Sequence, residues 1–507
     1  MNRKIGVILS YVMMIFEVLS TLLLTPFILR TLGQAEYGVY KLSAAIVAYL
    51  LLLDLGVGNA VTKYAAQYRV EGDIQQSRRF LGVSTIYYSV IALIGLVAGG
   101  ILVAIFPTAF ATGLTSSEAV LGQKLLIITV INAAVTLGTA GYANVIIGYE
   151  KFIVSKGWSI IQIILRIILT YVALKIGMGS IGIVSVNLLM TVLCRGFFVL
   201  YVLFGLKLKP MFSGIKASFL KEIVGYSSLI LLQMVATQIN AFVGQILLGI
   251  LVPASAVIIG IYSIGTQIVQ YFQSIGSSFP GILMPGVVKL VERGATPDQL
   301  CDEMVRIGRM VLMILAFIWC CFLFYGRQFI SLWVGDENLD AYFVAIILMF
   351  AYIFMMAESI GTQILWAKNE HKEQSFLKLG IVLVNIVSTI FLIKWNPLWG
   401  ATIGTFISLM LGDVLVMNIV FHKKIGISLK KYYAGLFKGI LPCLIISTVV
   451  GGLFSLLHLS GWLGFSCNIF IMVLVYAVCM FLFGFSAYEK SLIKSIFTKI
   501  FKRRKQE

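Results

Sequence analysis

Long apolar stretches recur along the whole chain and are separated by short polar links. A bilayer core about 30 Å thick needs roughly 20 apolar residues per helix, and fourteen stretches reach or approach that length. We predict spanning helices near residues 5–29, 38–62, 81–106, 121–147, 155–174, 180–204, 223–250, 255–279, 308–330, 341–366, 377–394, 397–421, 434–457 and 462–485. The predicted fold class is an all-α polytopic membrane protein.

The basic residues alternate between the two sides of this predicted bundle. Of 39 Lys and Arg residues, 31 fall in every second link counted from the N-terminus, six fall in the other links and two lie within helices. Lys and Arg collect in cytoplasmic loops. Both termini, including the basic tail 502–505, are therefore predicted to be cytoplasmic, in a multi-pass protein of a bacterial cytoplasmic (inner) membrane. The net charge of +18 then reflects topology, and no nucleic-acid partner is expected.

Composition removes most enzyme classes. Hydrophobic residues make up 60% of the chain and charged residues 12%, against about 25% charged in soluble domains. No predicted link is long enough to hold a catalytic domain. The three His residues fall in loops or at a span edge, and no phosphate-cradling Walker loop is present. We expect a transporter and no enzyme, with no catalytic residue, cofactor or metal site.

An internal repeat indicates how the helices are organised. Gly38, Val39 and Tyr40 are matched 222 residues later by Gly260, Ile261 and Tyr262. Many transporters consist of two similar halves. We therefore predict a six-helix lobe at 1–210, a second at 211–425, and two additional helices with a basic tail at 426–507.

The segment TPFILRTLG at 25–33, followed by YGVY at 37–40 and DLGVGNA at 54–60, is the most recognisable part of the chain. It resembles the polysaccharide flippases (O-antigen and oligosaccharide flippases) of the multidrug/oligosaccharidyl-lipid/polysaccharide exporter superfamily. The resemblance extends to the helix layout, and it implies a fold like that of the multidrug and toxin exporters. It also implies that the last two helices form a groove for a lipid tail, as in the lipid II flippases.

Polar residues follow one face of several predicted spans. The first span carries Ser10, Glu17, Thr21 and Thr25, and Gln233 lies in the seventh span and Gln267 and Gln270 in the eighth. Polar residues in spans usually face a bundle interior or an aqueous cavity. In the resembled family the first two helices of each half line the central cavity, which makes the three glutamines candidates for substrate binding. The alternative is that these groups merely bond neighbouring helices.

Charged residues deep in the predicted spans give sharper candidates. Arg166 and Arg195, with Lys41 and Arg30 nearer the outer mouth, are predicted to bind an anionic substrate. Structural pairing is the alternative, for example of Arg166 or Arg195 with the two carboxylates Glu358 and Asp413.

Two further acidic residues are candidates for a coupling-ion site. Glu17 lies midway along the first span, and Asp54 is the second candidate. A carboxylate in such a place could exchange a proton during transport, whereas a permanent pairing of Glu17 with a neighbouring cation is the alternative.

The resemblance and these residues together predict a flippase for oligosaccharide units linked to undecaprenyl diphosphate. It would work by alternating access, coupled to protons or another cation, in cell-surface polysaccharide assembly. Expected partners are the lipid-linked oligosaccharide, the bilayer, a polysaccharide polymerase and glycosyltransferases, with the protein acting as a monomer. A multidrug or cation antiporter of the same superfamily and a membrane-embedded glycan-modifying enzyme are the alternatives. The sequence specifies neither the glycan nor the coupling ion.

Overall fold

A computed structural model describes residues 2–213, 217–368, 370, 372–455, 460–486 and 488–491. All regular structure in these residues is helical. The predicted basic tail 502–505 lies outside the described part of the chain. Contacts divide the protein into two compact units: unit 1 comprises Met1–Ser263 and Lys378–Thr405, and unit 2 comprises Ile264–Leu377 and Phe406–Glu507. The lobe boundaries predicted at 210 and 425 stay a prediction.

Unit 1 contains the N-terminal helices. They are α1 (Asn2–Leu50), η1 (Leu51–Asp54), α2 (Val57–Glu71), α3 (Ile74–Ala109), α4 (Ser116–Gly138), α5 (Ala140–Gly148), α6 (Phe152–Lys175), α7 (Gly179–Leu200), η2 (Tyr201–Gly205) and α8 (Ala217–Leu251). Unit 1 also includes the first turns of α9 (Ala256–Glu292) and most of α13 (Lys372–Ile393) and α14 (Pro397–Ser408).

Apolar side chains on the outside of unit 1 fit a lipid environment. On α3, Leu93, Val97, Ile101 and Ile105 follow one another at intervals of four residues and are all at least half exposed. Residues four apart share one face of a helix, so this stripe presents a continuous apolar surface. Such a surface is stable against acyl chains and would be unfavourable in water.

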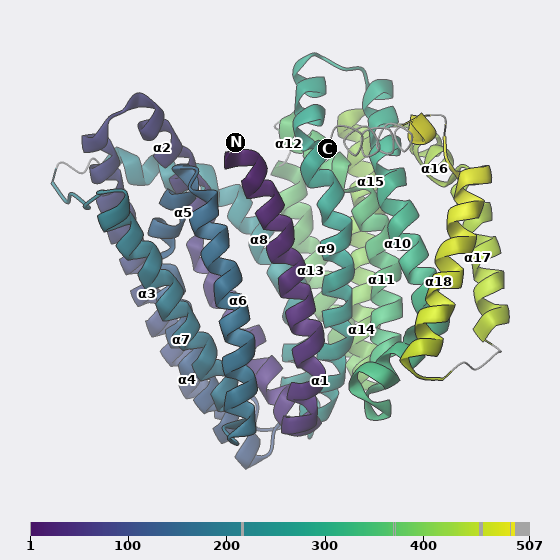
Figure 1. The fold of residues 1–507 in the computed structure, drawn as a ribbon, viewed down its shortest axis with the longest axis horizontal. Coiled ribbons are helices and arrows are strands. Elements are labelled where there is room, and N and C mark those ends of the chain that lie inside the picture. The colour runs from purple at the N-terminus through teal and green to yellow at the C-terminus, as the bar shows by residue number, and fades with distance from the viewer. Residues whose placement is uncertain are drawn as a thin grey trace, which may run out of the picture. The chain divides into compact units, whose positions relative to one another are not determined.

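The helix α1 contains both the first predicted span and most of the second (Figure 1). It is bent at Gly33, whose φ of 76° lies in the left-handed region that favours glycine. The second predicted span is itself interrupted after Asp54, where Leu55 (φ 55°) and Gly56 (φ 72°) both adopt left-handed conformations before α2 begins. The predicted uninterrupted helix at 38–62 is therefore wrong at this break.

The repeated glycine motifs face each other inside unit 1. A Cβ atom built on Gly38 would lie 1.8 Å from the carbonyl oxygen of Ala256 and 3.1 Å from the amide nitrogen of Gly260. A Cβ on Gly260 would lie 2.9 Å from the carbonyl oxygen of Gln34. The lack of a side chain at both positions thus lets the backbones of α1 and α9 approach closely.

A bond between two amides joins α8 to α13 in the same unit. Asn385 Nδ2 donates to Asn240 Oδ1 at 2.9 Å, and Asn385 is completely buried. Thr389 completes the group by donating its hydroxyl to Asn385 Oδ1 at 3.0 Å. Residues 378–405 are therefore held in unit 1 by polar as well as apolar contacts.

Unit 2 contains the remaining helices. They are α10 (Pro297–Val334), η3 (Asp336–Asn338), α11 (Ala341–Ala357), α12 (Ser359–Ala367), η4 (Leu409–Val416), α15 (Met417–Val420), η5 (Phe421–Ile425), α16 (Leu429–Phe437), α17 (Ile440–Ser455), α18 (Gly461–Cys479) and η6 (Met480–Gly484). The segments η4, η5 and η6 are π-helical, a form that is frequent at functional sites.

The last helices of unit 2 pack together. The helices α17 and α18 lie side by side (Figure 1) and both contact α10. The axes of α16 and α17 differ by 45° across a break at Gly439, which has a φ of 76°. The described residues from 429 to 484 thus form helices next to α10, and their assignment as a pair additional to two lobes stays a prediction.

Eleven helices among the described residues are long and apolar enough to span a membrane, or up to twelve if the bent pair α16–α17 counts as one. This confirms a polytopic membrane protein but not the predicted number of fourteen. One cause is α1, since Val12–Asp54 counts as a single helix across its bend at Gly33.

Candidate functional site

A polar pocket of about 150 Å³ lies within unit 1. Three elements form it: both arms of α1, the middle of α6, and α7. Its lining combines hydroxyl, amide, aromatic and charged groups from Glu17, Ser20, Thr21, Leu24, Thr25, Ile28, Tyr37, Tyr40, Lys41, Arg166, Thr170, Ile183 and Asn187. Three of the predicted site residues, Glu17, Lys41 and Arg166, thus come together in one pocket.

Arg166 and Glu17 form an ion pair in this pocket. Arg166 Nη2 donates to Glu17 Oε1 at 2.7 Å, and the two side chains are 29% and 50% exposed. The alternative in which Glu17 is paired with a cation therefore describes the observed geometry. An ion pair this exposed contributes only about 0–1 kcal/mol to stability. Because breaking the pair costs so little free energy, another anion could replace Glu17 at the guanidinium of Arg166.

Lys41 supplies the second cation of the pocket. Its ammonium lies 5.3 Å from the ring centre of Tyr37 and 5.9 Å from that of Tyr40. Aromatic faces attract a cation without neutralising it. The two rings therefore hold the ammonium of Lys41 within the lining of the pocket.

Part of the polar stripe on α1 serves the helix itself. Thr21 donates its hydroxyl to the carbonyl oxygen of Glu17 at 2.8 Å, and Thr25 donates to that of Thr21 at 2.7 Å. Bonds of this kind satisfy a hydroxyl within its own helix. These two residues line the pocket, yet their donors are already used.

The other predicted site residues lie outside this pocket. Arg30 is exposed at another place on α1, and Gln233 is half-buried on α8. Gln267 and Gln270 belong to unit 2, where Gln267 is buried and donates to the Tyr271 hydroxyl at 2.7 Å. The predicted roles of these four residues stay predictions.

Asp54 belongs to a second polar group of unit 1. The hydroxyl of Tyr88 on α3 donates to Asp54 Oδ1 at 2.7 Å. The side chain of Asn144 lies beside it, and a Cβ on Gly58 would come within 2.7 Å of that amide nitrogen. Arg195, on α7, is close enough to Tyr88 to interact with it electrostatically. Asp54 and Arg195 are therefore near the same tyrosine, away from the Glu17–Arg166 pocket.

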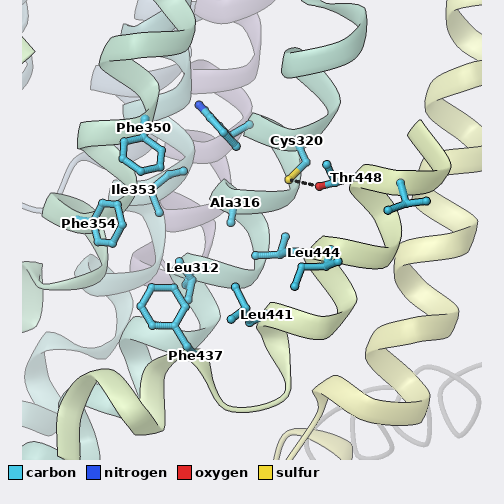
Figure 2. Close-up of a pocket in the computed structure, with 13 residues that line it drawn as sticks. Leu312, Ala316, Cys320, Phe350, Ile353, Phe354, Phe437, Leu441, Leu444 and Thr448 are labelled. Atoms are coloured by element: carbon cyan, nitrogen blue, oxygen red, sulfur yellow. Dashed lines mark hydrogen bonds between the residues drawn. The ribbon is translucent and has the colours of Figure 1, made fainter. Parts of the chain in front are cut away.

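Unit 2 holds an apolar pocket of about 410 Å³ (Figure 2). Its walls come from α10, α11, the end of α16 and α17, and Thr448 is the one residue of the lining with a hydroxyl group. That hydroxyl lies 3.6 Å from the Cys320 sulfur. The lining consists of Leu312, Ala316, Trp319, Cys320, Phe350, Ile353, Phe354, Phe437, Leu441, Leu444, Ile445, Thr448 and Val449. A pocket of this composition suits a hydrocarbon chain.

Sequence reasoning missed a buried polar cluster in unit 2. Glu358, suggested as a partner of Arg166 or Arg195, instead accepts hydrogen bonds from Tyr433 and Asn418. No sequence spacing links these three residues, since Asn418 and Tyr433 are 60 and 75 positions from Glu358. Within the described residues, no group of three or more His, Cys, Asp or Glu side chains could hold a metal ion.

Comparison with solved structures defines the class of fold. The lipid II flippase MurJ in an inward closed conformation matches with a TM-score of 0.72 at 16% identity, over 96% of this chain and 99% of that one. An inward-facing multidrug resistance MATE transporter of the MOP superfamily matches with a TM-score of 0.61 at 14% identity, over 82% and 94%. The MATE transporter DinF-BH in complex with R6G gives 0.62 at 17% identity, over 85% and 96%. The protein has the fold of these membrane transporters.

The family follows from the sequence. Residues 4–291, more than half of the chain, match the model of the polysaccharide biosynthesis protein family. The chain therefore belongs to this family. A comparison with curated protein sequences gives no significant match.

Proposed function

We propose that this protein is a flippase that moves undecaprenyl-diphosphate-linked oligosaccharide units across the cytoplasmic membrane for cell-surface polysaccharide assembly. The observation that carries the proposal is the chemistry of the two pockets. Unit 1 holds a polar pocket with Arg166 and Lys41, and unit 2 holds an apolar one. A lipid-linked sugar needs both kinds of environment, because its diphosphate is costly to bury without partners and its tail is hydrocarbon.

The charges in the polar pocket favour an anionic head group. Arg166 presents a planar fork of donors that matches phosphate oxygens, and Lys41 adds a compact point charge. A diphosphate carries more charge than the single carboxylate of Glu17, so it can compete for the guanidinium. The amide of Asn187 and the hydroxyls around it are suited to sugar hydroxyls.

The apolar pocket is the proposed place for the lipid tail. It is bounded by α17, one of the two additional C-terminal helices, together with α10 and α11. Aromatic and branched aliphatic side chains supply a hydrocarbon surface with few polar groups to desolvate.

Transport is proposed to proceed by alternating access and to be coupled to protons or another cation. Glu17 is the coupling candidate of the polar pocket, and Asp54 is the second candidate. When substrate displaces Glu17 from Arg166, the freed carboxylate becomes able to bind a proton or a cation. Arg195, Arg30, Gln233, Gln267 and Gln270 are proposed to contribute further contacts with the substrate.

The partners are proposed from the same chemistry. Glycosyltransferases would supply the lipid-linked oligosaccharide and a polysaccharide polymerase would consume it. We propose that the protein works as a monomer in a bacterial inner membrane with both termini in the cytoplasm.

The direct test is reconstitution into vesicles with a lipid-linked oligosaccharide whose sugar can be labelled or cleaved from outside only. Protein-dependent exposure of the sugar in the outer leaflet supports the proposal. Transport of a cationic dye such as R6G with no movement of the lipid-linked sugar would instead favour a multidrug antiporter. Chemical alteration of the sugar would favour a glycan-modifying enzyme.

A further inference from the structure

A buried carboxylate lies at the break between α11 and α12. Glu358 is 2% exposed and separates the two helices, since α11 ends at Ala357 and α12 begins at Ser359. Its Oε1 accepts a bond from the Tyr433 hydroxyl and another from Asn418 Nδ2, the latter at 3.0 Å. Its Oε2 is buried and has no hydrogen-bond partner. Only one of the two carboxylate oxygens is therefore satisfied.

A second acceptor without a partner lies in the same cluster. Asn418 is 5% exposed, and its amide nitrogen also contacts the Tyr433 hydroxyl at 2.6 Å. Its Oδ1 is buried and accepts no bond. Two orphan acceptors in one buried cluster are costly, because each has lost its water without gaining a donor. A proton on Glu358 Oε2 would remove the charge and turn one of these acceptors into a donor.

Three charged or titratable residues of the described part of the chain are relevant to Glu358. Asp413, on η4, is 7% exposed and close enough to repel a carboxylate charge. On α16, Tyr432 gives its hydroxyl to the Ala357 carbonyl oxygen at 3.0 Å. On α10, Arg309 directs its donors to Glu489 and to the carbonyl oxygens of Gly435, Lys438 and Gly484. None of these groups donates a hydrogen bond to Glu358 Oε2, which stays available to a proton.

The cluster and the apolar pocket are connected through α11 and α16, since Glu358 directly follows α11 and Tyr433 lies on α16. Phe354 precedes Glu358 by about one turn on α11, and Phe437 follows Tyr433 by about one turn on α16. Both phenylalanines line the pocket (Figure 2). Their ring centres are 6.4 Å apart, and the rings of Tyr433 and Phe437 are stacked at 6.4 Å with an angle of 13° between their planes. The bond from Tyr433 to Glu358 therefore fixes the pocket wall that α16 provides.

We propose that Glu358 is a proton-binding site that controls the apolar pocket of unit 2. In the ionised state the carboxylate holds Tyr433 by a charge-assisted hydrogen bond, and Phe437 stays in the position that leaves the pocket open. Binding of a proton at Oε2 weakens this bond, so that Tyr433 and the stacked ring of Phe437 can shift and the wall of the pocket loosens, while Arg309 and Tyr432 keep α16 in place. The inference rests on the proposed function only in taking a polyprenyl chain as the occupant of the pocket.

The test measures binding of a polyprenyl phosphate that carries a nitroxide on its chain. Trp319 lines the pocket and can be kept as the sole tryptophan of the full-length protein in detergent, so that its fluorescence is quenched when the chain binds. The measurement is made from about pH 5 to about pH 9, a range over which buried glutamates titrate. Unlabelled undecaprenyl phosphate serves as the competitor.

We expect the affinity of the wild-type protein for the polyprenyl phosphate to fall roughly tenfold from the alkaline to the acidic end of the pH range. This factor corresponds to the difference in strength between a charge-assisted and a neutral hydrogen bond. Glu358→Gln and Tyr433→Phe should both bind at the weaker, acidic level at every pH. Tyr432→Phe is the matched control, because it removes a bond to Ala357 on the same pair of helices but leaves Glu358 untouched. It should keep the wild-type pH dependence, and melting curves verify that all variants are folded.

Three results would overturn the inference. They are a pH dependence that persists in Glu358→Gln, a wild-type affinity that does not change with pH, and no competable quenching at any pH. A parallel measurement of sugar translocation separates this failure from that of the proposed function. If the protein binds the polyprenyl phosphate equally at all pH values and still moves the lipid-linked sugar, only the control of the pocket by a proton on Glu358 is refuted.

Discussion

Arg309 and Glu489 are 180 residues apart in the chain and form a buried ion pair with two hydrogen bonds, Nε to Oε1 at 2.9 Å and Nη2 to Oε2 at 3.1 Å. The side chains are only 8% and 6% exposed. The remaining donors of Arg309 reach the carbonyl oxygens of Gly435, Lys438 and Gly484. The guanidinium of Arg309, on α10, thus binds two other segments. One is the break between α16 and α17, and the other is the chain that follows α18.

This pair makes the stability of the protein depend on pH. Burial alone would raise the pKa of Glu489, but hydrogen bonds from Arg309 and Ser486 outweigh it and hold the pKa below the ordinary value of 4.5. A carboxyl with a lowered folded-state pKa stabilises the fold above its unfolded-state pKa and loses this effect as the pH falls. Glu489→Gln should lower the free energy of unfolding at pH 7 by about 3 kcal/mol, since it leaves Arg309 buried with its charge uncompensated.

The measurement is thermal unfolding of the detergent-solubilised protein at pH 7 and at about pH 3. The difference in free energy of unfolding between wild type and Glu489→Gln should narrow at the lower pH, because the wild-type carboxyl binds a proton more readily in the unfolded state than in the folded one. Glu303→Gln is the control, because its pairing with Arg306 within α10 is more exposed and should contribute less than about 1 kcal/mol. An equal gap at both pH values would contradict the assignment.

Arg166→Lys should reduce transport of the lipid-linked oligosaccharide roughly tenfold, because an ammonium cannot reproduce the paired contacts that a guanidinium makes with phosphate. Initial rates in reconstituted vesicles are the readout. Arg69→Lys is the matched control, since Arg69 pairs with Glu150 at 3.2 Å and does not line the pocket. If Arg166→Ala transports at the wild-type rate, Arg166 does not bind the substrate.

Glu17→Gln should abolish the response of transport to an imposed pH gradient. Glutamine keeps the shape of the side chain and can still accept a bond from Arg166, but it cannot bind and release a proton. The rate of sugar translocation is measured with and without the gradient in the same vesicles. A variant that responds as the wild type does would show that coupling lies elsewhere, with Asp54 as the next residue to change.

Gly38→Ala should strongly reduce the yield of folded protein. Its new methyl group would lie 1.8 Å from the carbonyl oxygen of Ala256, and backbone atoms cannot give way as a flexible side chain can. Overpacking of this kind costs about 1–3 kcal/mol or more. Gly100→Ala on α3 is the control, because nothing lies within 4 Å of its Cβ position and alanine favours a helix. Size-exclusion profiles and melting temperatures compare the two.

The predicted orientation can be tested by labelling single cysteines in a variant without the seven native ones, of which Cys467 is exposed. Thr115, which caps α4, and Asp336, in η3, should react with an impermeant thiol reagent in intact cells when replaced by cysteine. Gln76, in the first turn of α3, should not. Reaction at Gln76 with none at Thr115 would reverse the topology.

The sequence was sufficient for the class of fold because membrane helices are specified locally by apolar length. It also placed Glu17 and Arg166 among the candidates, since each is a charge deep in an apolar stretch, and it added Lys41 as a cation nearer the outer mouth. It could not show that Glu17 and Arg166 meet, because they are 149 residues apart and only the packing of α6 against α1 joins them.

Local sequence patterns could not predict the helix break after Asp54 or the buried cluster around Glu358. The interruption after Asp54 depends on the left-handed conformations of Leu55 and Gly56, and leucine gives no signal of such a conformation. The partners of Glu358 are a tyrosine and an amide on distant helices. Similarly, the matching residues Gly38 and Gly260 indicated a duplication, but their direct approach is a property of the packed structure.

The composition of unit 1 has a consequence for biosynthesis. The ribosome completes residues 1–263 before it makes residues 378–405, which belong to the same unit. Until α13 enters the membrane, Asn240 has no access to the amide of Asn385, and an unpaired amide is unfavourable in hydrocarbon. The packing of the N-terminal helices of unit 1 therefore stays incomplete until residues 378–405 are made, more than a hundred residues later. Until then these helices are loosely packed or bound by an insertase. Truncation within the second half of the gene should accordingly disturb the first half of the protein.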